Sequence, residues 1–391
     1  MSRKWQVFPV AWLVVLLFVS VASAEQGFLY FREGEDASGS ERTLARAQPD
    51  GEFWVSESLI SRPGLTYGQS LPNGHYLFTD QTYSVCLSYF DKSGTFWLGE
   101  SKEDRGVRLV SVSPDGKHLV FSFPDPKGGF ELREYIFGDG WQYLPLAHLD
   151  RFAWVSPGRT RYAYFAERES GRSPVASDSD LYVGDLPSGK PRLLVGTVHA
   201  ESTGSSVWAG GPTLLWVDDD RILYQETVPT SDPAIGEADS HGQRHQQTLC
   251  LINVVTGEKL LTLAAPGLLG RRQHLWREWP GGQIHYRAGE EYLVDLEQKK
   301  LTPAADVAPL YVKRVRKEFA YSRVLLRDRA ADKTVVSFPF EISLLCSPDG
   351  RYAAFVGSTE DSHQSLWVYD RVTGQLSCIA SGRFELVRWL P

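Results

Sequence analysis

Short apolar runs follow turn-forming residues at regular intervals along most of this chain. Two stretches show the unit most clearly, because Ser113–Phe121 reads SPDGKHLVF and Ser347–Phe355 reads SPDGRYAAF. In such a stretch proline fixes φ, aspartate bonds to its own backbone and glycine takes a positive φ. The run that follows is short and apolar, as in a β-strand. Each copy therefore predicts a tight turn that leads into a strand.

The turn and its strand return with a period of about 43 residues, which is the sign of a repeat architecture. Pro72 and Pro114 are 42 residues apart, and Pro114 and Pro157 are 43 residues apart. Within a period a second apolar run, a Thr-Gly turn and a further strand follow, as in Leu366–Asp370 and Val372–Gln375. Four short antiparallel strands per period are typical of one blade of a β-propeller. Weaker copies of the unit occur at Leu71–Phe78, Ser156–Phe165, Asp219–Tyr224 and Pro280–Tyr286.

The two ends of the sequence complete one copy of the unit between them. Pro391 lies one period after Pro348, and the preceding Phe384–Leu390 parallels Phe152–Ser156. The strand that should follow such a proline is supplied by Phe28–Phe31. A propeller usually joins its first and last blades by letting one terminus complete the sheet of the other. We therefore predict that the C-terminal segment pairs with the N-terminal strand in one blade.

Counting one second strand per period predicts seven four-stranded antiparallel blades. The period stretches to 68 residues between Pro280 and Pro348. Leu301–Phe340 is therefore one blade with an insertion or two truncated blades, which leaves an eighth blade open. A two-domain β-sandwich is the alternative, but it would not explain the matching ends. The predicted second strands begin near Phe28, Tyr76, His118, Tyr162, Ile222, Ile284 and Tyr352.

Residues 1–24 carry the pattern of a secretory signal peptide. Two cations precede the apolar run Val10–Val21, and Ala22–Ala24 forms a small-x-small cleavage signal. The run is shorter than the roughly 20 residues that a membrane span needs. We expect cleavage after this signal, with an uncleaved anchor as the alternative. Residues 25–391 would then be a single propeller domain in the periplasm or outside the cell, with no membrane span.

Composition narrows the class of partner. The chain has 391 residues, of which 42% are hydrophobic and 23% charged, so it is expected to fold rather than to be disordered or fibrous. Its formal net charge is −7, and loss of the two cations of the leader makes it −9. Nucleic acid is a poor partner for such an acidic chain.

The cysteines do not form an evident disulfide framework. Cys346 and Cys378 fall on the first and last strands of one predicted blade. Three strand spacings of about 4.8 Å place them about 14 Å apart, beyond the reach of a disulfide. We therefore predict free and mostly buried thiols for these and for Cys86 and Cys250.

Between Ser347 and Gly374 the pattern Ser-Pro-Asp-Gly, apolar strand, polar loop, Leu-Trp-Val-Tyr-Asp and x-x-Thr-Gly resembles the repeat of TolB-type propellers. This repeat is a distant relative of WD-repeat blades and also occurs in the propellers of prolyl-oligopeptidase-type enzymes. The resemblance covers most of residues 25–391 as a repeat, although only two or three copies match well. It implies the fold more than the function, because the blades leave no room for the extra α/β domain of TolB or for a hydrolase domain.

A search for linear catalytic motifs finds none. The chain has no Gly-x-Ser-x-Gly, and Gly68–Ser70 runs into a blade turn at Leu71–Pro72. It also has no His-Glu-x-x-His, P-loop or Gly-x-Gly-x-x-Gly. Propeller enzymes gather their residues from several blades, so an enzyme remains an alternative.

The long loops all belong to one face of the predicted blades. They are Arg32–Arg42, Glu167–Asp180, Glu226–Gln247 and Ser358–Ser365. Long loops grouped on one rim of a rigid scaffold are where binding usually occurs. A carboxylate and imidazole set could also hold a divalent cation, but solvated charges are the simpler interpretation, and we predict no cofactor. The candidate partner-binding residues are Asp178, Asp180, Asp232, Glu237, Asp239, His241, His245, Asp361 and His363.

Three other features have ordinary structural interpretations. Asp218–Asp220 resembles a calcium ligand set but occupies the position of a blade turn. Arg271–Arg272 and Lys313–Lys317 contain basic clusters, which we interpret as solvated, with contact to an anionic polymer as the minority alternative. Ten of the twelve tryptophans lie after the leader and could offer a platform for sugars, but most fall within strands, so packing between blades is the better account.

Our first functional hypothesis is an exported, non-catalytic and monomeric propeller that binds a protein or peptide partner through its long-loop rim. The second is a propeller lyase or hydrolase that acts on a carbohydrate or small metabolite, with metal held by channel-facing acids and histidines. A third is a subunit of an envelope complex whose enzyme or transporter is another chain.

Overall fold

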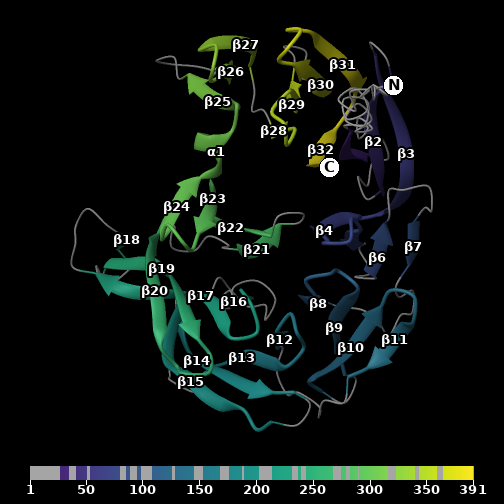
Figure 1. Cartoon of the computed structure of the whole chain (residues 1–391). Helices are drawn as coiled ribbons and strands as arrows, with labels where there is room; N and C mark the ends of the chain where they lie inside the picture. Colours follow the sequence, from purple (N-terminus) through teal and green to yellow (C-terminus); the bar gives the residue numbers. More distant parts are fainter. Residues whose placement is uncertain are drawn as a thin grey trace, which may run out of the picture. The chain divides into compact units, whose positions relative to one another are not determined.

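The computed structural model describes residues 27–34, 41–50, 53–79, 85–88, 95–97, 108–125, 128–144, 153–167, 176–186, 189–201, 214–230, 237–238, 244–266, 274–278, 282–288, 290–315, 323–339, 343–358 and 364–390. The chain divides into two compact units. Unit 1 combines the residues up to Pro63 with those from Ala308 onward, and unit 2 is Gly64–Val307. The described residues are almost all in β-strands (Figure 1).

Unit 1 contains three antiparallel sheets. Sheet A has the order β3-β2-β1-β32, sheet G the order β25-β26-β27, and sheet H the order β28-β29-β30-β31. Their strands are β1 (Phe28–Glu33), β2 (Glu41–Asp50), β3 (Phe53–Pro63), β25 (Leu310–Val315), β26 (Arg323–Asp328), β27 (Lys333–Phe338), β28 (Ser343–Cys346), β29 (Tyr352–Ser358), β30 (Gln364–Asp370), β31 (Leu376–Ser381) and β32 (Phe384–Trp389).

Unit 2 contains five antiparallel sheets, B to F, which follow one another along the chain. Sheets B, C and D consist of β4 (Thr66–Ser70), β5 (Tyr76–Thr79), β6 (Val85–Ser88), β7 (Thr95–Trp97), β8 (Arg108–Val112), β9 (His118–Pro124), β10 (Phe130–Ile136), β11 (Gly140–Tyr143), β12 (Trp154–Val155), β13 (Arg161–Glu167), β14 (Ala176–Asp185) and β15 (Arg192–Glu201). Sheets E and F consist of β16 (Leu214–Trp216), β17 (Arg221–Thr230), β18 (Glu237–Ala238), β19 (Arg244–Asn253), β20 (Lys259–Ala265), β21 (His274–Glu278), β22 (Gln283–Ala288), β23 (Glu290–Asp295) and β24 (Lys300–Pro303), followed by the short α1 (Ala304–Val307).

The sheets confirm an all-β fold with the blades of a β-propeller. Seven of them are four-stranded meanders, counting sheet E, in which the two-residue β18 is added to four strands. The predicted second strands begin within one residue of their predicted starts. The stretch Leu301–Phe340 is not one blade with an insertion, because β24 ends sheet F and β25–β27 form the separate three-stranded sheet G. Sheet G is thus the additional sheet that the 68-residue period between Pro280 and Pro348 had left open.

The predicted pairing of the two ends is confirmed in sheet A. β1 and β32 are antiparallel, with Phe28 opposite Trp389 and Arg32 opposite Phe384. The Leu390 amide also donates to the Gly27 carbonyl over 2.8 Å. Figure 1 shows the yellow β32 beside the purple strands of this sheet. One blade is therefore built from residues at opposite ends of the sequence.

Aromatic rings join sheet A to sheet H. Phe28 and Trp389 are fully or almost fully buried, with ring centroids 5.0 Å apart. Trp54 meets Trp389 at 5.9 Å, and Tyr352 stacks on Trp389 at 6.1 Å. The Trp389 indole nitrogen also donates to the Leu345 carbonyl over 2.8 Å, so its polar end is satisfied. The C-terminal strand therefore anchors two sheets at once.

The two Ser-Pro-Asp-Gly turns have the same hydrogen bonds. The Ser113 and Ser347 hydroxyls bond to Asp115 and Asp349 over 2.5 and 2.6 Å. Each serine oxygen also accepts the amide of the strand's first residue, over 3.0 Å from His118 and 2.8 Å from Tyr352. The glycines at 116 and 350 have φ values of 69° and 68°, which favour glycine. The repeated sequence is thus a repeated turn geometry.

The described cysteines form no disulfide. Cys250, Cys346 and Cys378 are free thiols, and the last two lie on β28 and β31, the first and last strands of sheet H, as expected. Cys250 is buried and Cys346 partly buried, but Cys378 is exposed. The expectation of mostly buried thiols is therefore wrong for Cys378, which lies on an outer strand. The side chain of Cys86 is outside the described residues.

A buried ion pair connects sheet G to sheet H. The Arg371 guanidinium donates to both oxygens of Asp328, over 2.9 and 3.2 Å. Asp328 is 4% exposed, and hydrogen bonds from Arg371 hold the pKa of its carboxyl below the ordinary value. Arg371 also donates to the Gly350 carbonyl over 2.7 Å. The three-stranded sheet is therefore fixed to the Ser-Pro-Asp-Gly turn of its neighbour.

Within the described residues, no helix has the length and apolar character that a membrane span requires.

Replacing Trp389 tests the sheet A closure. We expect Trp389→Ala to lower the free energy of unfolding by about 3–5 kcal/mol, because it removes a buried indole that contacts two sheets. Urea denaturation followed by circular dichroism measures the change. Val372→Ala is the control, because Val372 is 75% exposed in the same unit and should change stability by less than about 0.5 kcal/mol. Equal urea midpoints for the two variants would contradict the role of Trp389 in the pairing of β32 with β1.

Replacing Asp328 tests the ion pair through its pH dependence. The folded-state pKa of Asp328 is lowered, so its stabilisation is present above the unfolded pKa and is lost as pH falls through the folded pKa. Asp328→Asn should cost about 1–3 kcal/mol at pH 7, and its difference from the wild type should shrink below about pH 4. Asp332→Asn, at a side chain that is 85% exposed, is the control. A pH-independent difference would argue against the ion pair.

Candidate functional site

The structure places only part of the predicted rim. Asp180 and His245 are described, and Asp178 and Glu237 are placed as strand residues of β14 and β18. Because their side chains are not described, nothing is concluded for the last two. The predicted residues that lie outside the described ranges are Asp232, Asp239, His241, Asp361 and His363.

Asp180 and His245 are integrated into strands. The Asp180 carboxylate accepts the Thr197 amide over 2.9 Å, at a point where β14 and β15 shift register. Thr197 has a φ of 59°, so Asp180 stabilises a strained residue in a bulge. His245 is paired with Pro229 on one side and Glu237 on the other. Both residues therefore have a local structural environment in addition to any contact with a partner.

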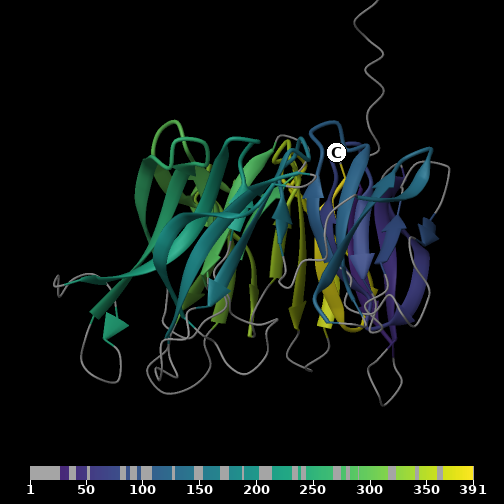
Figure 2. The ribbon, with the colours of Figure 1, turned by 90° about the horizontal axis from the view of Figure 1, so that it is seen from below.

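Two predicted loops are shorter than the sequence indicated. β14 begins at Ala176, so the last five residues of the predicted loop Glu167–Asp180 are strand. β17 continues to Thr230 and β19 begins at Arg244, so both ends of the predicted loop Glu226–Gln247 are also strand. The ten-residue strands β14, β15, β17 and β19 are the longest of unit 2, and they are drawn in teal in Figure 2. Polar residues continue these ladders, because backbone pairing does not need an apolar side chain.

Among the described residues, no group of three or more His, Cys, Asp or Glu side chains is arranged to hold a metal ion.

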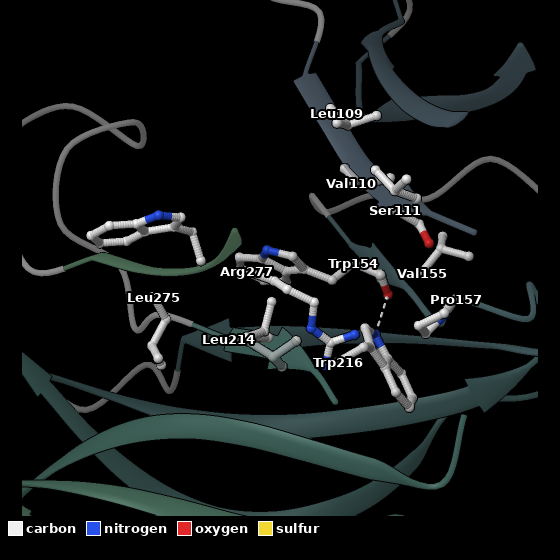
Figure 3. A pocket seen from close by; sticks show the side chains of 13 residues that line it. Leu109, Val110, Ser111, Trp154, Val155, Pro157, Leu214, Trp216, Leu275 and Arg277 are labelled. Carbon is white, nitrogen blue, oxygen red and sulfur yellow. Dashed lines mark hydrogen bonds between the residues drawn. The ribbon is translucent and has the colours of Figure 1, made fainter. Parts of the chain in front are cut away.

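The first strands of sheets C, D, E and F line a recess in unit 2. β8, β12, β16 and β21 contact one another in this order, and Figure 1 shows them on the same side of their sheets. The recess has a volume of about 170 Å³. Four consecutive blades thus each contribute one strand to the same hollow (Figure 3). Its lining residues are Leu109, Val110, Ser111, Val112, Trp154, Val155, Pro157, Leu214, Leu215, Trp216, Leu275, Trp276 and Arg277.

Most of the lining is aliphatic or aromatic. The Trp216 indole nitrogen donates to the Trp154 carbonyl over 3.1 Å, the bond drawn as a dashed line in Figure 3. The Ser111 hydroxyl donates to the Ser156 carbonyl over 3.1 Å. These two bonds connect neighbouring blades, so the polar atoms of these side chains fix the wall. The recess therefore presents a rigid, mainly apolar surface.

Arg277 is the one charged side chain among the described residues that line the recess. Its guanidinium points toward Trp216 in Figure 3 and donates to the Val217 carbonyl over 2.7 Å. Burial lowers the pKa of Arg277, and the attraction of Asp218 offsets this only in part. The recess thus combines an apolar surface with one cationic side chain.

Side chains of β22 hold the ring of the neighbouring Trp276 in place. It stacks on His285, with ring centroids 5.2 Å apart and an angle of 24° between planes. His285 lies between two carboxylates, at 3.1 Å from Glu278 and 2.8 Å from Glu291. The Arg287 guanidinium also lies over the Trp276 ring at 5.2 Å. These contacts hold the β21 wall of the recess in place.

Asp218–Asp220 has the structural role that its turn position predicts. Asp218 accepts the Asp220 amide over 3.0 Å and bonds to Arg221. Asp219 accepts the Gly158 amide of the preceding blade's turn over 2.6 Å, and Asp220 is paired with Arg161. Asp219 and Asp220 therefore connect two blade turns, and Asp218 stabilises its own turn.

A second hollow lies in unit 1 between sheets A and H, with a volume of about 330 Å³. It is bordered by the ends of β2 and β3 in sheet A and by the turns of sheet H. It also borders the aromatic rings that join these sheets. The residues that line it are Pro49, Phe53, Trp54, Arg351, Tyr352, Val368, Asp370, Thr373, Gln375 and Ser377.

The sequence contained a partial signal for the recess that the motif search missed. Arg277, Ser111 and Trp154 each stand three residues before the proline of a blade turn, and all three line the recess. The shared spacing marks a common position of the first strands. Gln69 and Arg388 occupy the same position in other copies, so a polar or charged residue there does not by itself identify Arg277.

Comparison with protein-family models and with curated proteins finds no match. Solved structures match at low identity. The dihydro-heme d1 dehydrogenase NirN, in complex with DHE, has a TM-score of 0.45 and 14% identity, with 92% of this chain and 75% of that chain covered. The propeller domain of the Trilobed protease from Pyrococcus furiosus, described as having an open velcro topology, has a TM-score of 0.42 and 10% identity, covering 90% and 96%.

A putative TolB from Agrobacterium tumefaciens has a TM-score of 0.31 and 12% identity, with 76% of this chain and 94% of that chain covered. Several peptidases also match, and this chain spans only 39% to 53% of their lengths. These neighbours include propeller proteins of different activities. The fold assignment itself rests on the sheets of this chain.

Replacing Arg277 tests whether its position serves something other than stability. Because burial lowers its pKa, folding disfavours the charged form, and removing the charge relieves that cost. We expect the free energy of unfolding of Arg277→Met, measured in urea, to lie within about 1 kcal/mol of the wild-type value. Arg161→Met is the matched control, because the hydrogen bonds that Arg161 donates to Asp220 and Asp185 raise its pKa, and its loss should destabilise the fold. A larger loss for Arg277→Met than for Arg161→Met would assign Arg277 a structural role.

Proposed function

We propose that this chain is an exported, non-catalytic β-propeller that binds a protein or peptide partner. The observation that carries the proposal is the recess formed by β8, β12, β16 and β21. Its volume of about 170 Å³ lies below the range of about 300–1,000 Å³ that is typical of small-molecule sites. A hollow of this size suits one side chain of a larger partner better than a whole metabolite.

The chemistry of the recess specifies what the partner presents. Trp154, Trp216 and the aliphatic wall suit an apolar group, and Arg277 suits a carboxylate close to it. A peptide that ends in an apolar residue combines both, as does an apolar side chain next to an aspartate or glutamate. Buried aromatic and arginine side chains are also the types that contribute most to protein interfaces.

In this proposal the predicted rim adds contacts at the other end of the blades, because Trp216 pairs with Ile222 whereas His245 pairs with Pro229, seven residues further along β17. In this proposal the rim residues Asp178, Asp180, Asp232, Glu237, Asp239, His241, His245, Asp361 and His363 meet basic groups of the partner. The strands β14 and β19 carry several of them. Such rim charges would mainly affect the rate of association, because exposed ion pairs contribute little affinity.

The cellular location and the propeller type in this proposal rest on the leader and the repeat. We propose that residues 1–24 are removed and that residues 25–391 act as one monomeric, TolB-type propeller in the periplasm or outside the cell. The Ser-Pro-Asp-Gly turns support the repeat type, and the Val10–Val21 run supports export. No cofactor is part of this proposal.

Crosslinked affinity purification from the cell envelope of the source organism tests the proposal. We expect the tagged wild type to recover a defined partner and Arg277→Gln to recover at least tenfold less, since a buried charge contact with its partner contributes about 2–5 kcal/mol. Quantitative mass spectrometry measures the recovery.

Arg287→Gln is the matched control, because Arg287 contacts the back of Trp276 and its side chain is 55% exposed. It should recover the partner as the wild type does. Equal recovery by Arg277→Gln and the wild type would show that the recess is not the binding site. No specific recovery by the wild type would count against a binding function.

A further inference from the structure

The groove between sheets A and H differs from the recess in both size and charge. Its volume of about 330 Å³ reaches the range of about 300–1,000 Å³ that small-molecule sites occupy. It lies between the ends of β2 and β3 and the β30–β31 turn, and all of its lining belongs to unit 1. It is therefore a site for a ligand that the recess of unit 2 could not hold.

The aromatic part of the lining is rigid at its base and exposed at its mouth. Trp54 is held by Phe28, Tyr352 and Trp389, with ring centroids at 5.7, 5.4 and 5.9 Å. The adjacent Phe53 is 75% exposed. Covering an exposed phenyl ring with C–H groups is favourable by about 25 cal/mol per Å² of apolar surface removed from water. The groove therefore favours a ligand with an apolar face.

The charges of the lining cancel. Arg351 donates to Asp370 over 3.0 Å, and hydrogen bonding to Asp370 raises the pKa of the guanidinium. Burial alone would raise the pKa of the Asp370 carboxyl, but hydrogen bonds from Arg351 and from the turn amides lower it below its ordinary value. Both groups therefore stay ionised and neutralise each other. The groove has no excess charge to attract an ionic ligand.

The remaining lining offers hydrogen bonds of both kinds. The Gln375 amide donates and accepts, and so does the Ser377 hydroxyl. A purely apolar ligand would cover these groups without satisfying them, which costs about 1–3 kcal/mol for each buried group. The ligand therefore needs hydroxyl or amide groups at its edge as well as an apolar face.

We propose that this groove binds a neutral saccharide of one or two sugar units. A pyranose ring has C–H groups on its face and hydroxyls at its rim. The face would cover Phe53 and the border of Trp54, and the hydroxyls would bond to Gln375, Ser377 and the outer atoms of the Arg351–Asp370 pair. This site is independent of the recess, because the two hollows share no residue.

A peptide fits the groove less well. An extended peptide binds by adding backbone hydrogen bonds along an open strand edge. At the groove the outer strands β3 and β31 of the two sheets contact each other, and the hollow lies at the ends of β2 and β3 and beside the β30–β31 turn. Its volume also suits a compact ligand.

Titration with three neutral disaccharides tests the proposal: cellobiose, N,N′-diacetylchitobiose and maltose. Isothermal calorimetry measures the affinity, and saturation-transfer NMR identifies which sugar protons lie against aromatic rings. We expect at least one disaccharide to bind, with its ring protons saturated. Phe53→Ala and Gln375→Ala should each weaken that binding by about tenfold or more.

The chain supplies matched controls in sheet E, whose Val255–Glu258 turn has the same Val-Thr-Gly sequence as Val372–Gln375. Val255→Ala removes an apolar side chain that is 56% exposed, and Glu258→Ala removes the residue that corresponds to Gln375. Both should leave the affinity unchanged. Thermal melts of all four variants should match the wild type, because these side chains lie at the surface.

A charge variant tests the neutrality argument. Asp370→Asn keeps an oxygen that can accept the Val372 amide, which Asp370 now accepts over 2.8 Å, but leaves the Arg351 charge unbalanced. Binding should shift by about tenfold toward a disaccharide that carries a uronic acid. The proposal is wrong if none of the three disaccharides binds at roughly 10 mM, which corresponds to less than about 3 kcal/mol. It is also wrong if Phe53→Ala and Gln375→Ala bind as the wild type does.

Discussion

The pairing of β32 with β1 is the constraint on which unit 1 depends. It joins residues from opposite ends of the sequence. The entropy cost of closing such a long loop grows only slowly with the length of the loop. The gain is local and large, because Phe28 and Trp389 are buried together and the Trp389 indole also bonds to Leu345 in sheet H. Sheets A and H therefore share one aromatic core. Sheet G joins them through Arg371, whose guanidinium bonds to both Asp328 and the Gly350 carbonyl.

Unit 2 is held by contacts between turns as well as by apolar packing between sheets. The Asn73 amide donates to the Gly116 carbonyl over 2.8 Å, and Asp219 accepts the Gly158 amide over 2.6 Å. Each contact joins the turn of one blade to the turn of a neighbouring blade. The first strands that lead into these turns are thereby fixed in position, and they line the recess with a preformed surface.

The two hollows illustrate how charge balance separates ligand classes on one scaffold. The recess contains the Arg277 guanidinium and no carboxylate among its described lining residues, so it favours an anionic group. The groove contains the Arg351–Asp370 pair, whose charges compensate at 3.0 Å, so it favours a neutral and polar ligand. Both hollows include aromatic rings held by neighbouring aromatic contacts. The aromatic surface is therefore common to both, and the two hollows differ in volume, in polar lining and in charge balance.

The sequence by itself determined the blades, because each turn is local. Ser113–Asp115 and Ser347–Asp349 specify their hydrogen bonds within five residues, and the strands that follow need only a short apolar run. The matching ends also predicted the β1–β32 pairing, since the repeat leaves one unit incomplete at each end. Only the tertiary structure decided that Leu301–Phe340 contributes a separate three-stranded sheet, because the period is lost there. It alone also showed where β14, β17 and β19 extend into the predicted loops, because polar residues can continue a backbone ladder. The recess and the groove are likewise features that only the tertiary structure showed. Ser111, Trp154 and Arg277 are far apart in sequence, and their common surface exists only once four blades pack together, because a cavity depends on the distances between elements rather than on the residues of any one of them.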